Sequence, residues 1–316
     1  MPRLPNTSLD IHPLCLGGDV FGWTADHEQS FAVLDRYAEA GGNFIDIADM
    51  YSYWVPGNSG GEAETIVGRW MAERGNRDEM VIATKVGKLE GLRGLAAGTV
   101  TRAAEDSLRR LQTDHIDLYY SHEDDPDTDL AETLGAFDRL VRDGKVRHIG
   151  ASNCAPDRLR EGLAVSDRDG LARYVAVEPE YSLMERDYEL AGREVCRDAG
   201  LGCVPYSALA SGFLTGKYRP GEPVPPSPRG GMGAAYLDDS RGVPVLEAMD
   251  EIASEHDTTM PAVALAWVAA QDTVVAPISS ARTVTQLEAL LPMAEVELSE
   301  EELDRLTAAG EIESRA

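Results

Sequence analysis

Four side chains suited to acid–base chemistry lie at regular intervals in the first half of the chain. Asp46, Lys85 and His122 are 39 and 37 residues apart, and Tyr51 follows Asp46 by five residues. A charged group at the end of an apolar strand is costly unless it is paired, so Asp46 and Lys85 are expected to pair. An ammonium beside Tyr51 favours tyrosinate and lowers a pKa that is ordinarily about 10. Tyr51 could then exchange a proton with a substrate oxygen while His122 polarises the carbonyl.

The intervals between these residues match repeated strand–helix units. Short apolar or β-branched runs predict eight strands, at 14–17, 43–46, 80–85, 116–121, 146–152, 174–178, 202–207 and 273–277. Amphipathic segments between them predict helices, among them 28–40, 62–74, 99–111, 130–142 and 156–165. Eight such alternations predict an α/β protein with a (β/α)8 TIM barrel, in which consecutive strand ends point to one mouth. Asp46, Lys85 and His122 should therefore converge there.

Several segments fall outside the simple alternation. The residues before the first strand are expected to form a short hairpin at the barrel floor. Long βα loops are expected at 50–61, which is rich in glycine, and at 211–240, which is rich in proline and glycine. Ser299 followed by three glutamates is a capping pattern and predicts an extra C-terminal helix up to residue 309. No linker divides the sequence, so residues 1–316 are predicted to form a single domain.

Composition limits the classes of partner. The 29 basic and 55 acidic side chains give a net charge of −26, and no basic run suggests a nucleic-acid surface. No run approaches the ~18 apolar residues of a membrane span, and the first residues lack the apolar core of a signal peptide. The four cysteines show no zinc-ligand spacing, so no metal is expected. We therefore expect a cytoplasmic protein with reduced thiols that binds neither nucleic acid nor membrane; its oligomeric state stays open.

The motifs around the four reactive residues resemble those of the aldo-keto reductases. The segments Phe44-Ile-Asp-Ile-Ala-Asp-Met-Tyr51, Ala83-Thr-Lys-Val-Gly87 and Asp117-Leu-Tyr-Tyr-Ser-His122 occur in the family's order, and further matches lie at 150–153, 177–183, 205–218 and 276–287. The branch that they most resemble is the bacterial one that is also similar to potassium-channel β subunits. The resemblance implies a carbonyl or alcohol oxidoreductase in which Tyr51 is the general acid/base. Asp46 and Lys85 would tune Tyr51, and His122 would orient the carbonyl.

The same resemblance implies a nicotinamide coenzyme. Ser152, Asn153 and the residue at 178 would hold the carboxamide, and Tyr206 would stack on the ring. The remaining contacts would come from Ser207, Leu209, Ser211 and Lys217 along the pyrophosphate, and from Ser280, Arg282 and Gln286 around the adenosine 2′-phosphate. Because an arginine binds a phosphate through two parallel hydrogen bonds, NADPH/NADP⁺ is favoured over NADH.

Two positions depart from the family pattern. Glu178 stands where the family usually has glutamine, and Leu290 where it often has asparagine near the adenine. An ionised Glu178 would accept a hydrogen bond but could not donate one, and its charge would favour the oxidised nicotinamide. A protonated Glu178 would behave as a glutamine. Both alternatives are open from the sequence.

Other functions also remain open at this point. Trp23 and Trp54 lie in predicted βα loops and are either core aromatics or walls of a substrate pocket. Lys85 at a barrel strand end could instead form a Schiff base, as in an aldolase or lyase. A non-catalytic NADPH-binding regulatory subunit is the third reading. The substrate, a small carbonyl or alcohol, and the physiological direction are not specified by the sequence.

Overall fold

Eight short parallel strands form the centre of the molecule. The computed structural model describes residues 1–311. The strands are β1 (Cys15–Gly17), β2 (Phe44–Asp46), β3 (Val81–Val86), β4 (Ile116–Ser121), β5 (Val146–Ser152), β6 (Tyr174–Glu178), β7 (Gly202–Cys203) and β8 (Ile278–Ser279). Their order in the sheet is β7-β6-β5-β4-β3-β2-β1-β8, with β8 beside β1 and every pairing parallel. This is the order expected when each strand is followed by a helix and returns beside its predecessor.

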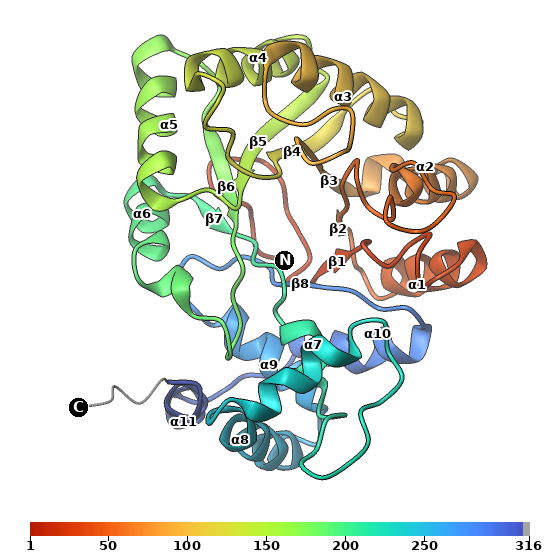
Figure 1. The fold of residues 1–316 in the computed structure, drawn as a ribbon, viewed down its shortest axis with the longest axis vertical. Coiled ribbons are helices and arrows are strands. Elements are labelled where there is room, and N and C mark those ends of the chain that lie inside the picture. Colours follow the sequence, from red (N-terminus) through yellow and green to blue (C-terminus); the bar gives the residue numbers. More distant parts are fainter. Residues whose placement is uncertain (312–316) are drawn as a thin grey trace.

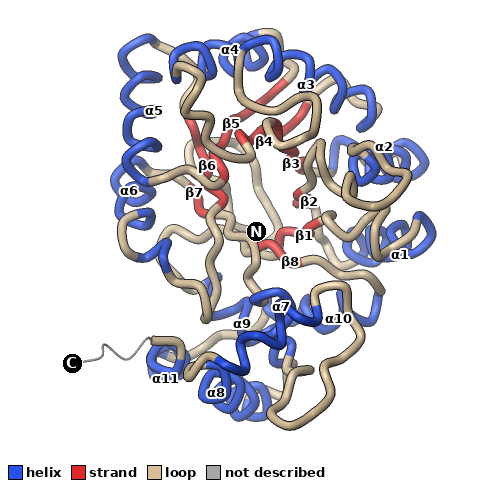
Figure 2. Tube along the Cα trace, in the orientation of Figure 1, coloured by secondary structure: helices blue, strands red, loops and turns tan. Residues whose placement is uncertain are grey.

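Backbone hydrogen bonds also connect the two ends of this sheet. Cys203 N donates to Thr273 O (2.8 Å), Val275 N to Cys203 O (2.9 Å) and Ile278 N to Pro205 O (2.8 Å). The strands surround a central space and the helices lie outside them (Figure 1). The tube view shows the same ring of strands within a ring of helices (Figure 2). The predicted (β/α)8 barrel is therefore confirmed.

The first six predicted strands match the structure within one residue at each end, but the last two do not. β7 ends at Cys203 instead of Ser207, because Pro205 has no N–H to continue the ladder. β8 is Ile278–Ser279, just beyond the predicted range 273–277. The range 273–277 does bond to β7, but Pro277 again lacks a donor, and the pairing with β1 begins after it.

The outer layer contains the predicted helices. They are α1 (His27–Glu39), α2 (Glu62–Arg74), α3 (Ala97–Leu111), α4 (Leu130–Arg142), α5 (Pro156–Asp169), α6 (Gly192–Ala199), α7 (Gly230–Ala235), α8 (Gly242–Glu255), α9 (Met260–Ala269), α10 (Val284–Leu290) and α11 (Glu300–Ala309). Short 3-10 turns occur at η1 (Arg77–Glu79), η2 (Asp187–Glu189), η3 (Ala210–Thr215), η4 (Tyr236–Asp238) and η5 (Leu291–Ala294). None of these helices is long and apolar enough to cross a membrane.

Side-chain caps explain where several helices begin. Asp26 caps α1 and Ser299 caps α11, each in a reciprocal capping box, and Thr259 caps α9. The predicted C-terminal helix is thus confirmed, together with its capping pattern. The segment 211–240, expected as a long loop, instead contains the end of η3, the short helix α7 and η4. Its glycines at 230–233 lie inside α7, so their abundance did not mark a loop at that point.

The interior of the barrel is closed below by the N-terminal residues. Leu4, Leu9 and Ile11 pack with inward side chains of the strands, and Arg3 and Asp10 form an antiparallel bridge. The expected hairpin at the barrel floor is therefore present. The N-terminus lies inside the ring of strands in Figure 1. Above this floor the interior is filled by buried side chains that range from Ala83 to Phe44 and Tyr120, which leaves the polar strand ends at the opposite mouth.

Helices α2 and α3 approach closely at Gly68. A Cβ added at Gly68 would lie 2.6 Å from Leu111 Cα and 2.7 Å from the Leu111 carbonyl carbon, both backbone atoms. Backbone atoms cannot move aside as the end of a flexible side chain can. The contact matters for the site because α2 follows the loop that carries Tyr51.

We expect Gly68→Ala to destabilise the protein by about 1–3 kcal/mol, because the added methyl overpacks this contact. Gly135→Ala is the matched control, since Gly135 is also inside a helix and a Cβ there meets nothing within 4 Å. That change should stabilise by about 0.5–1 kcal/mol through helix propensity. Urea unfolding midpoints of the two variants test this, and equal shifts in the same direction would contradict it.

Candidate active site

Strand alternation places the reactive residues on the inner face of the barrel. Phe44, Val81, Ala83, Leu118 and Tyr120 belong to the interior core. Side chains two residues further along each strand point to the same side. The inward positions at the upper strand ends are therefore Asp46 on β2, Lys85 on β3, His122 just after β4 and Glu178 on β6, so the predicted convergence is observed.

Lys85 lies at the centre of this cluster. Its side chain is fully buried, and Nζ donates to Asp46 Oδ2 (2.5 Å), Tyr51 Oη (3.0 Å) and the Ile47 carbonyl (3.1 Å). Glu178 Oε1 lies 3.3 Å from the same nitrogen, so a second carboxyl group contacts Lys85. Burial works to lower the pKa of Lys85, but Asp46, Glu178 and Tyr51 raise it, and the net direction is upward. Lys85 therefore keeps its charge.

The pKa of Tyr51 moves opposite to the expected direction. The ammonium of Lys85 does lower it, but burial raises it more, and Asp46 and Glu178 add to the rise. The net pKa lies well above the ordinary value, so Tyr51 holds its proton at neutral pH. The sequence argument included only Lys85 and omitted desolvation and the second carboxylate. A protonated phenol is suited to donate a proton to a substrate oxygen.

His122 is neutral in this environment. Burial lowers its pKa well below the ordinary value, with smaller contributions from Lys85 and Lys88. Its ring lies against the ring of Tyr51, with centroids 6.0 Å apart. A neutral imidazole can donate one N–H, so His122 and Tyr51 can both donate hydrogen bonds to the same substrate oxygen.

A hydrogen-bond network lies beside the Lys85 cluster. Asn153 Nδ2 donates to the His122 carbonyl (2.9 Å) and to Ser152 Oγ (3.0 Å), while the Tyr206 hydroxyl donates to Asn153 Oδ1 (2.7 Å). Ser152 Oγ donates to the Glu178 backbone carbonyl (3.0 Å). The network fixes these side chains between β5, β6 and the segment after β7.

A cavity of about 790 Å³ opens above the cluster and extends toward α10. This volume is large enough for a dinucleotide-sized ligand. Of the residues predicted for the site, all but three line it. Those that do are Trp23, Asp46, Tyr51, His122, Asn153, Glu178, Tyr206, Ser207, Leu209, Ser211, Lys217, Ser280, Arg282 and Gln286. Lys85 and Ser152 are buried behind the wall. Trp54 is also outside the lining and contacts Trp23 edge to face, with centroids 5.4 Å apart.

Two cations share the far end of the cavity. Burial and the neighbouring Arg282 lower the pKa of Lys217. Neither Lys217 nor Arg282 has an acidic partner within 4 Å in residues 1–311, although acidic side chains outnumber basic ones 55 to 29. Gln286 Oε1 accepts from the Arg282 backbone N–H (2.9 Å) and so fixes the chain there. Neighbouring cations without counter-ions mark a site for an anionic ligand.

The segment after β7 has a strained backbone where it lines the cavity. Ser207, Ala210 and Ser211 have φ of +54°, +47° and +55°, and Gly212 follows at +86°. Left-handed conformations of residues other than glycine cost energy, persist only where the surroundings hold them, and are concentrated at ligand sites. A Cβ at Gly212 would lie 3.0 Å from Lys217 Nζ, so the lysine crosses directly over this turn.

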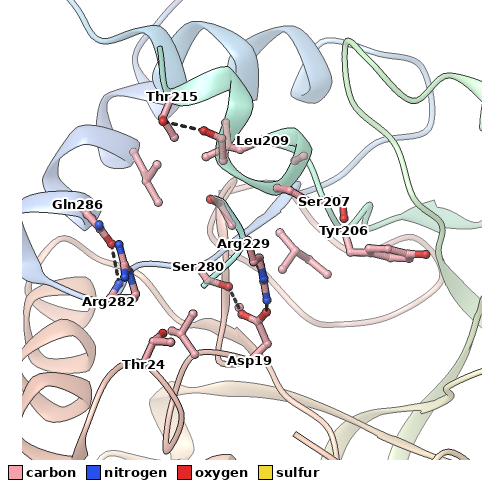
Figure 3. A pocket seen from close by; sticks show the side chains of 18 of the residues that line it. Asp19, Thr24, Tyr206, Ser207, Leu209, Thr215, Arg229, Ser280, Arg282 and Gln286 are labelled. Atoms are coloured by element: carbon pink, nitrogen blue, oxygen red, sulfur yellow. Dashed lines mark hydrogen bonds and ion pairs between the residues drawn. The ribbon is translucent and has the colours of Figure 1, made fainter. Parts of the chain in front are cut away.

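The lining residues that the sequence analysis missed include Asp19 and Arg229, which form an ion pair. Arg229 pairs with Asp19, Ser280 donates to the same carboxylate, and the Arg229 guanidinium lies 5.4 Å from the Trp23 ring centroid. Figure 3 shows Arg229 and Ser280 meeting at Asp19 within the pocket. Asp19 follows β1 by two residues, so the strand-end rule that found Asp46 could have found it. Arg229 lies in a glycine-rich segment with no periodic signal.

Comparisons with known proteins agree with this geometry. The family model described as "Aldo/keto reductase family" matches residues 13–311. The chain belongs to the aldo/keto reductase family. It is 36% identical to "Uncharacterized oxidoreductase YrpG" of Bacillus subtilis over 96% of this chain and 93% of that one. It is 32% identical to "Protein tas" of Escherichia coli over 98% and 97%, and 33% identical to "Norsolorinic acid reductase stcV" of Emericella nidulans over 95% and 78%.

Membership of this family makes the chain an oxidoreductase, and the two departures from its pattern can now be placed. Glu178 is the second carboxyl group in contact with Lys85, and Leu290 lines the end of the cavity near Arg282. Burial, followed by the charge of Asp46, raises the pKa of Glu178 well above its ordinary value. Of the two states left open by the sequence, this favours the protonated one at neutral pH. Within residues 1–311, no group of three or more His, Cys, Asp or Glu is placed to hold a metal ion.

A second buried network supports the loop that carries Tyr51. Glu64 on α2 is buried and accepts from Arg110 Nε (2.5 Å) and from Thr84 Oγ1 on β3 (2.7 Å). Asp49, two residues before Tyr51, is fully buried, and neither carboxylate oxygen has a hydrogen-bond partner within the described residues. Burial and the nearby Glu64 raise the pKa of Asp49 to about 8. Asp49 is therefore protonated in the folded protein at neutral pH.

We expect Asp49 to make the free energy of unfolding fall as pH rises. Because its pKa is about 8 when folded and 3.8 otherwise, the folded state holds one more proton between those values. The contribution falls by up to about 1.4 kcal/mol per pH unit in this window. Asp49→Asn should remove that slope. Urea unfolding at about pH 5.5 and about pH 7.5 measures it, and an unchanged slope in the variant would contradict the assignment.

Proposed function

We propose that the protein is an NADPH-dependent carbonyl reductase, able to run in reverse as an alcohol dehydrogenase, in which Tyr51 is the general acid/base. The observation that carries the proposal is the Asp46–Lys85–Tyr51 contact chain at the floor of the cavity, with His122 beside it. Together these groups can deliver one proton to a carbonyl oxygen and donate a second hydrogen bond to it. The family membership supports the reaction class.

The residues present fit NADPH. Lys217 and Arg282 supply cations for phosphates, the strained segment 207–212 runs along the cavity, and Tyr206 presents a ring at its inner end. Glu178 Oε2 is buried without a hydrogen-bond partner in the described residues. A hydrogen bond to the coenzyme would satisfy this atom. Ser152 and Asn153, with Glu178, would hold the carboxamide. Ser207, Leu209 and Ser211 would line the pyrophosphate, with Ser280, Arg282 and Gln286 around the 2′-phosphate.

The chemistry of the chain's own residues follows from their protonation states. When bound, a reduced nicotinamide supplies the hydride that adds to the carbonyl carbon. Tyr51 holds a proton at neutral pH and donates it to the carbonyl oxygen, while neutral His122 donates a hydrogen bond to the same oxygen. Lys85 remains charged and stabilises the tyrosinate that is left. In the reverse direction the same tyrosinate accepts the proton of the alcohol.

The geometry argues against the two alternative functions. A Schiff-base lysine must be neutral to attack a carbonyl. Lys85 pairs with Asp46 and also contacts Glu178, its pKa is raised, and it lies behind the cavity wall. A non-catalytic regulatory subunit would not need Tyr51, Lys85, Asp46 and His122 in contact, and the relatives' names include reductases.

Substrate and setting are proposed at a coarser level. Trp23 lines the cavity mouth and would pack against an apolar or aromatic part of a small carbonyl substrate, with Trp54 supporting it from behind. The four cysteines are free thiols, which fits the proposed cytoplasmic location.

We expect Tyr51→Phe to lower kcat for carbonyl reduction by about 10²–10⁴, because the proton donor is lost. The affinity for NADPH should remain nearly unchanged. Tyr53→Phe removes the same hydroxyl two residues along the same loop and should retain activity. Steady-state kinetics with a panel of aldehydes, together with NADPH titration, test both variants. Wild-type turnover in Tyr51→Phe would disprove the mechanism.

We expect Arg282→Ala to raise the dissociation constant for NADPH by about tenfold or more, since a charge-assisted contact contributes about 1.5–3 kcal/mol. NADH binding should change little, because NADH lacks the 2′-phosphate. Arg219→Ala is the control, since Arg219 lies 3.7 Å from Asp250 and does not line the cavity. Fluorescence titration of all three proteins decides the matter. An equal loss for both coenzymes would show that Arg282 has a structural role instead.

A further inference from the structure

The barrel interior holds more negative charge than Lys85 can balance. Asp46 and Glu178 are only 2% and 3% exposed, and both pair with one fully buried ammonium. If both were ionised, one buried negative charge would have no counter-ion, which is strongly unfavourable. One of the two must therefore hold a proton. Asp46 has the shorter contact with Lys85, 2.5 Å against 3.3 Å, so the proton belongs to Glu178.

The other groups around Glu178 favour the same assignment. Tyr51, Tyr120 and Tyr206 and the thiols of Cys15 and Cys203 are near enough to feel its charge, and all of them are neutral at physiological pH. The remaining cation, Lys88, contributes less to the pKa of Glu178 than Asp46 or Lys85 does. No second buried cation among the described residues compensates the carboxylate.

Hydrogen-bond donors are scarce at this end of the cavity. Asn153 Nδ2 uses its two N–H groups on the His122 carbonyl and Ser152 Oγ, and Ser152 uses its hydroxyl proton on the Glu178 carbonyl. The Tyr206 hydroxyl donates to Asn153. A carboxamide needs both an acceptor for its NH2 and a donor for its oxygen. Asn153 and Ser152 can therefore only accept hydrogen bonds from the carboxamide, whereas a protonated Glu178 can donate one to its oxygen.

We propose that Glu178 carries a proton on Oε2 and donates it to the carboxamide oxygen of the coenzyme, so that loss of this proton weakens coenzyme binding. The inference rests on the proposed function. Oε1 faces Lys85, while Oε2 is buried and has no partner in residues 1–311. The glutamine usual in the family would donate at every pH, whereas Glu178 donates only while protonated. The affinity of the site for the coenzyme should therefore fall as the pH rises and Glu178 loses its proton.

A second cavity gives this proton a separate route to solvent. It has a volume of about 390 Å³, lies between the segments that follow β5 and β6, and has Glu178, Asn153 and Tyr206 in common with the main cavity. Glu180, Glu185 and Asp187 also line it. Glu178 can thus exchange its proton while the coenzyme fills the main cavity. Raising the pH of the preformed complex should accelerate coenzyme dissociation.

The first test measures binding, not turnover. NADPH and NADP⁺ are titrated against wild type, Glu178→Gln and Asp49→Asn from about pH 7 to about pH 10. Both coenzyme forms should lose affinity in wild type and Asp49→Asn above the titration point of Glu178, by up to about tenfold per pH unit. Lys217 and Arg282 are present in all three proteins, so their own titration cancels in the comparison. Glu178→Gln should lack this loss.

Identical pH profiles of wild type and Glu178→Gln would overturn the proposal. So would a substitution that at about pH 7 weakens NADP⁺ alone, because that is the result expected of an ionised Glu178. Binding of neither coenzyme to wild type at about pH 7 would instead refute the proposed function.

The second test needs no coenzyme. Infrared difference spectra between neutral and alkaline samples should show loss of a carboxylic-acid carbonyl band in wild type. Part of this band should be absent from Glu178→Gln and another part from Asp49→Asn, the other buried acid that titrates in this range. A spectrum of Glu178→Gln identical to that of wild type would show that Glu178 does not change its protonation state between the two samples and would overturn the proposal.

Discussion

The active end of the barrel depends on one buried positive charge. Lys85 holds Asp46, Glu178, the Tyr51 hydroxyl and a backbone carbonyl around a single nitrogen. A buried ammonium is tolerated only with such partners, and its loss would leave a carboxylate uncompensated. The same contacts set the protonation states, because Lys85 stays charged and Tyr51 stays protonated. The packing around Lys85 and the protonation states of its neighbours therefore both depend on charge balance in a nearly dry interior.

The rest of the molecule keeps this cluster dry on one side and open on the other. The N-terminal hairpin and the inward apolar side chains exclude water from below. Above, the segments after β1 and β7 meet through Asp19 and Arg229 (Figure 3). Lys217 and Arg282 keep positive charge at the far end of the cavity in a chain whose net charge is −26. Local cations can thus hold an anionic ligand that the overall field of the protein repels.

Much of this arrangement could be predicted from sequence because it rests on local patterns. Apolar runs, helix caps and strand–helix alternation specify the barrel, and the parity of side chains along a strand brings Asp46, Lys85 and His122 to one mouth. Two of the misses involved contacts between distant segments. β8 was misplaced because its start depends on pairing with β1, and Arg229 was missed because its partner, Asp19, is 210 residues away.

The sequence by itself determined the fold class, the reactive residue types and their meeting at the strand ends. These follow from the alternation of side chains along strands and from the spacing of apolar residues along helices. Only the tertiary structure decided the protonation states. Whether Tyr51 and Glu178 hold protons depends on burial and on every charge within a few ångströms, contributed by different strands. Such electrostatic sums have no local signature, because the interacting groups Asp46, Lys85 and Glu178 come from three different strands. In the sequence Glu178 therefore appears as a single substitution, whereas in the barrel it shares the buried ammonium of Lys85 with Asp46.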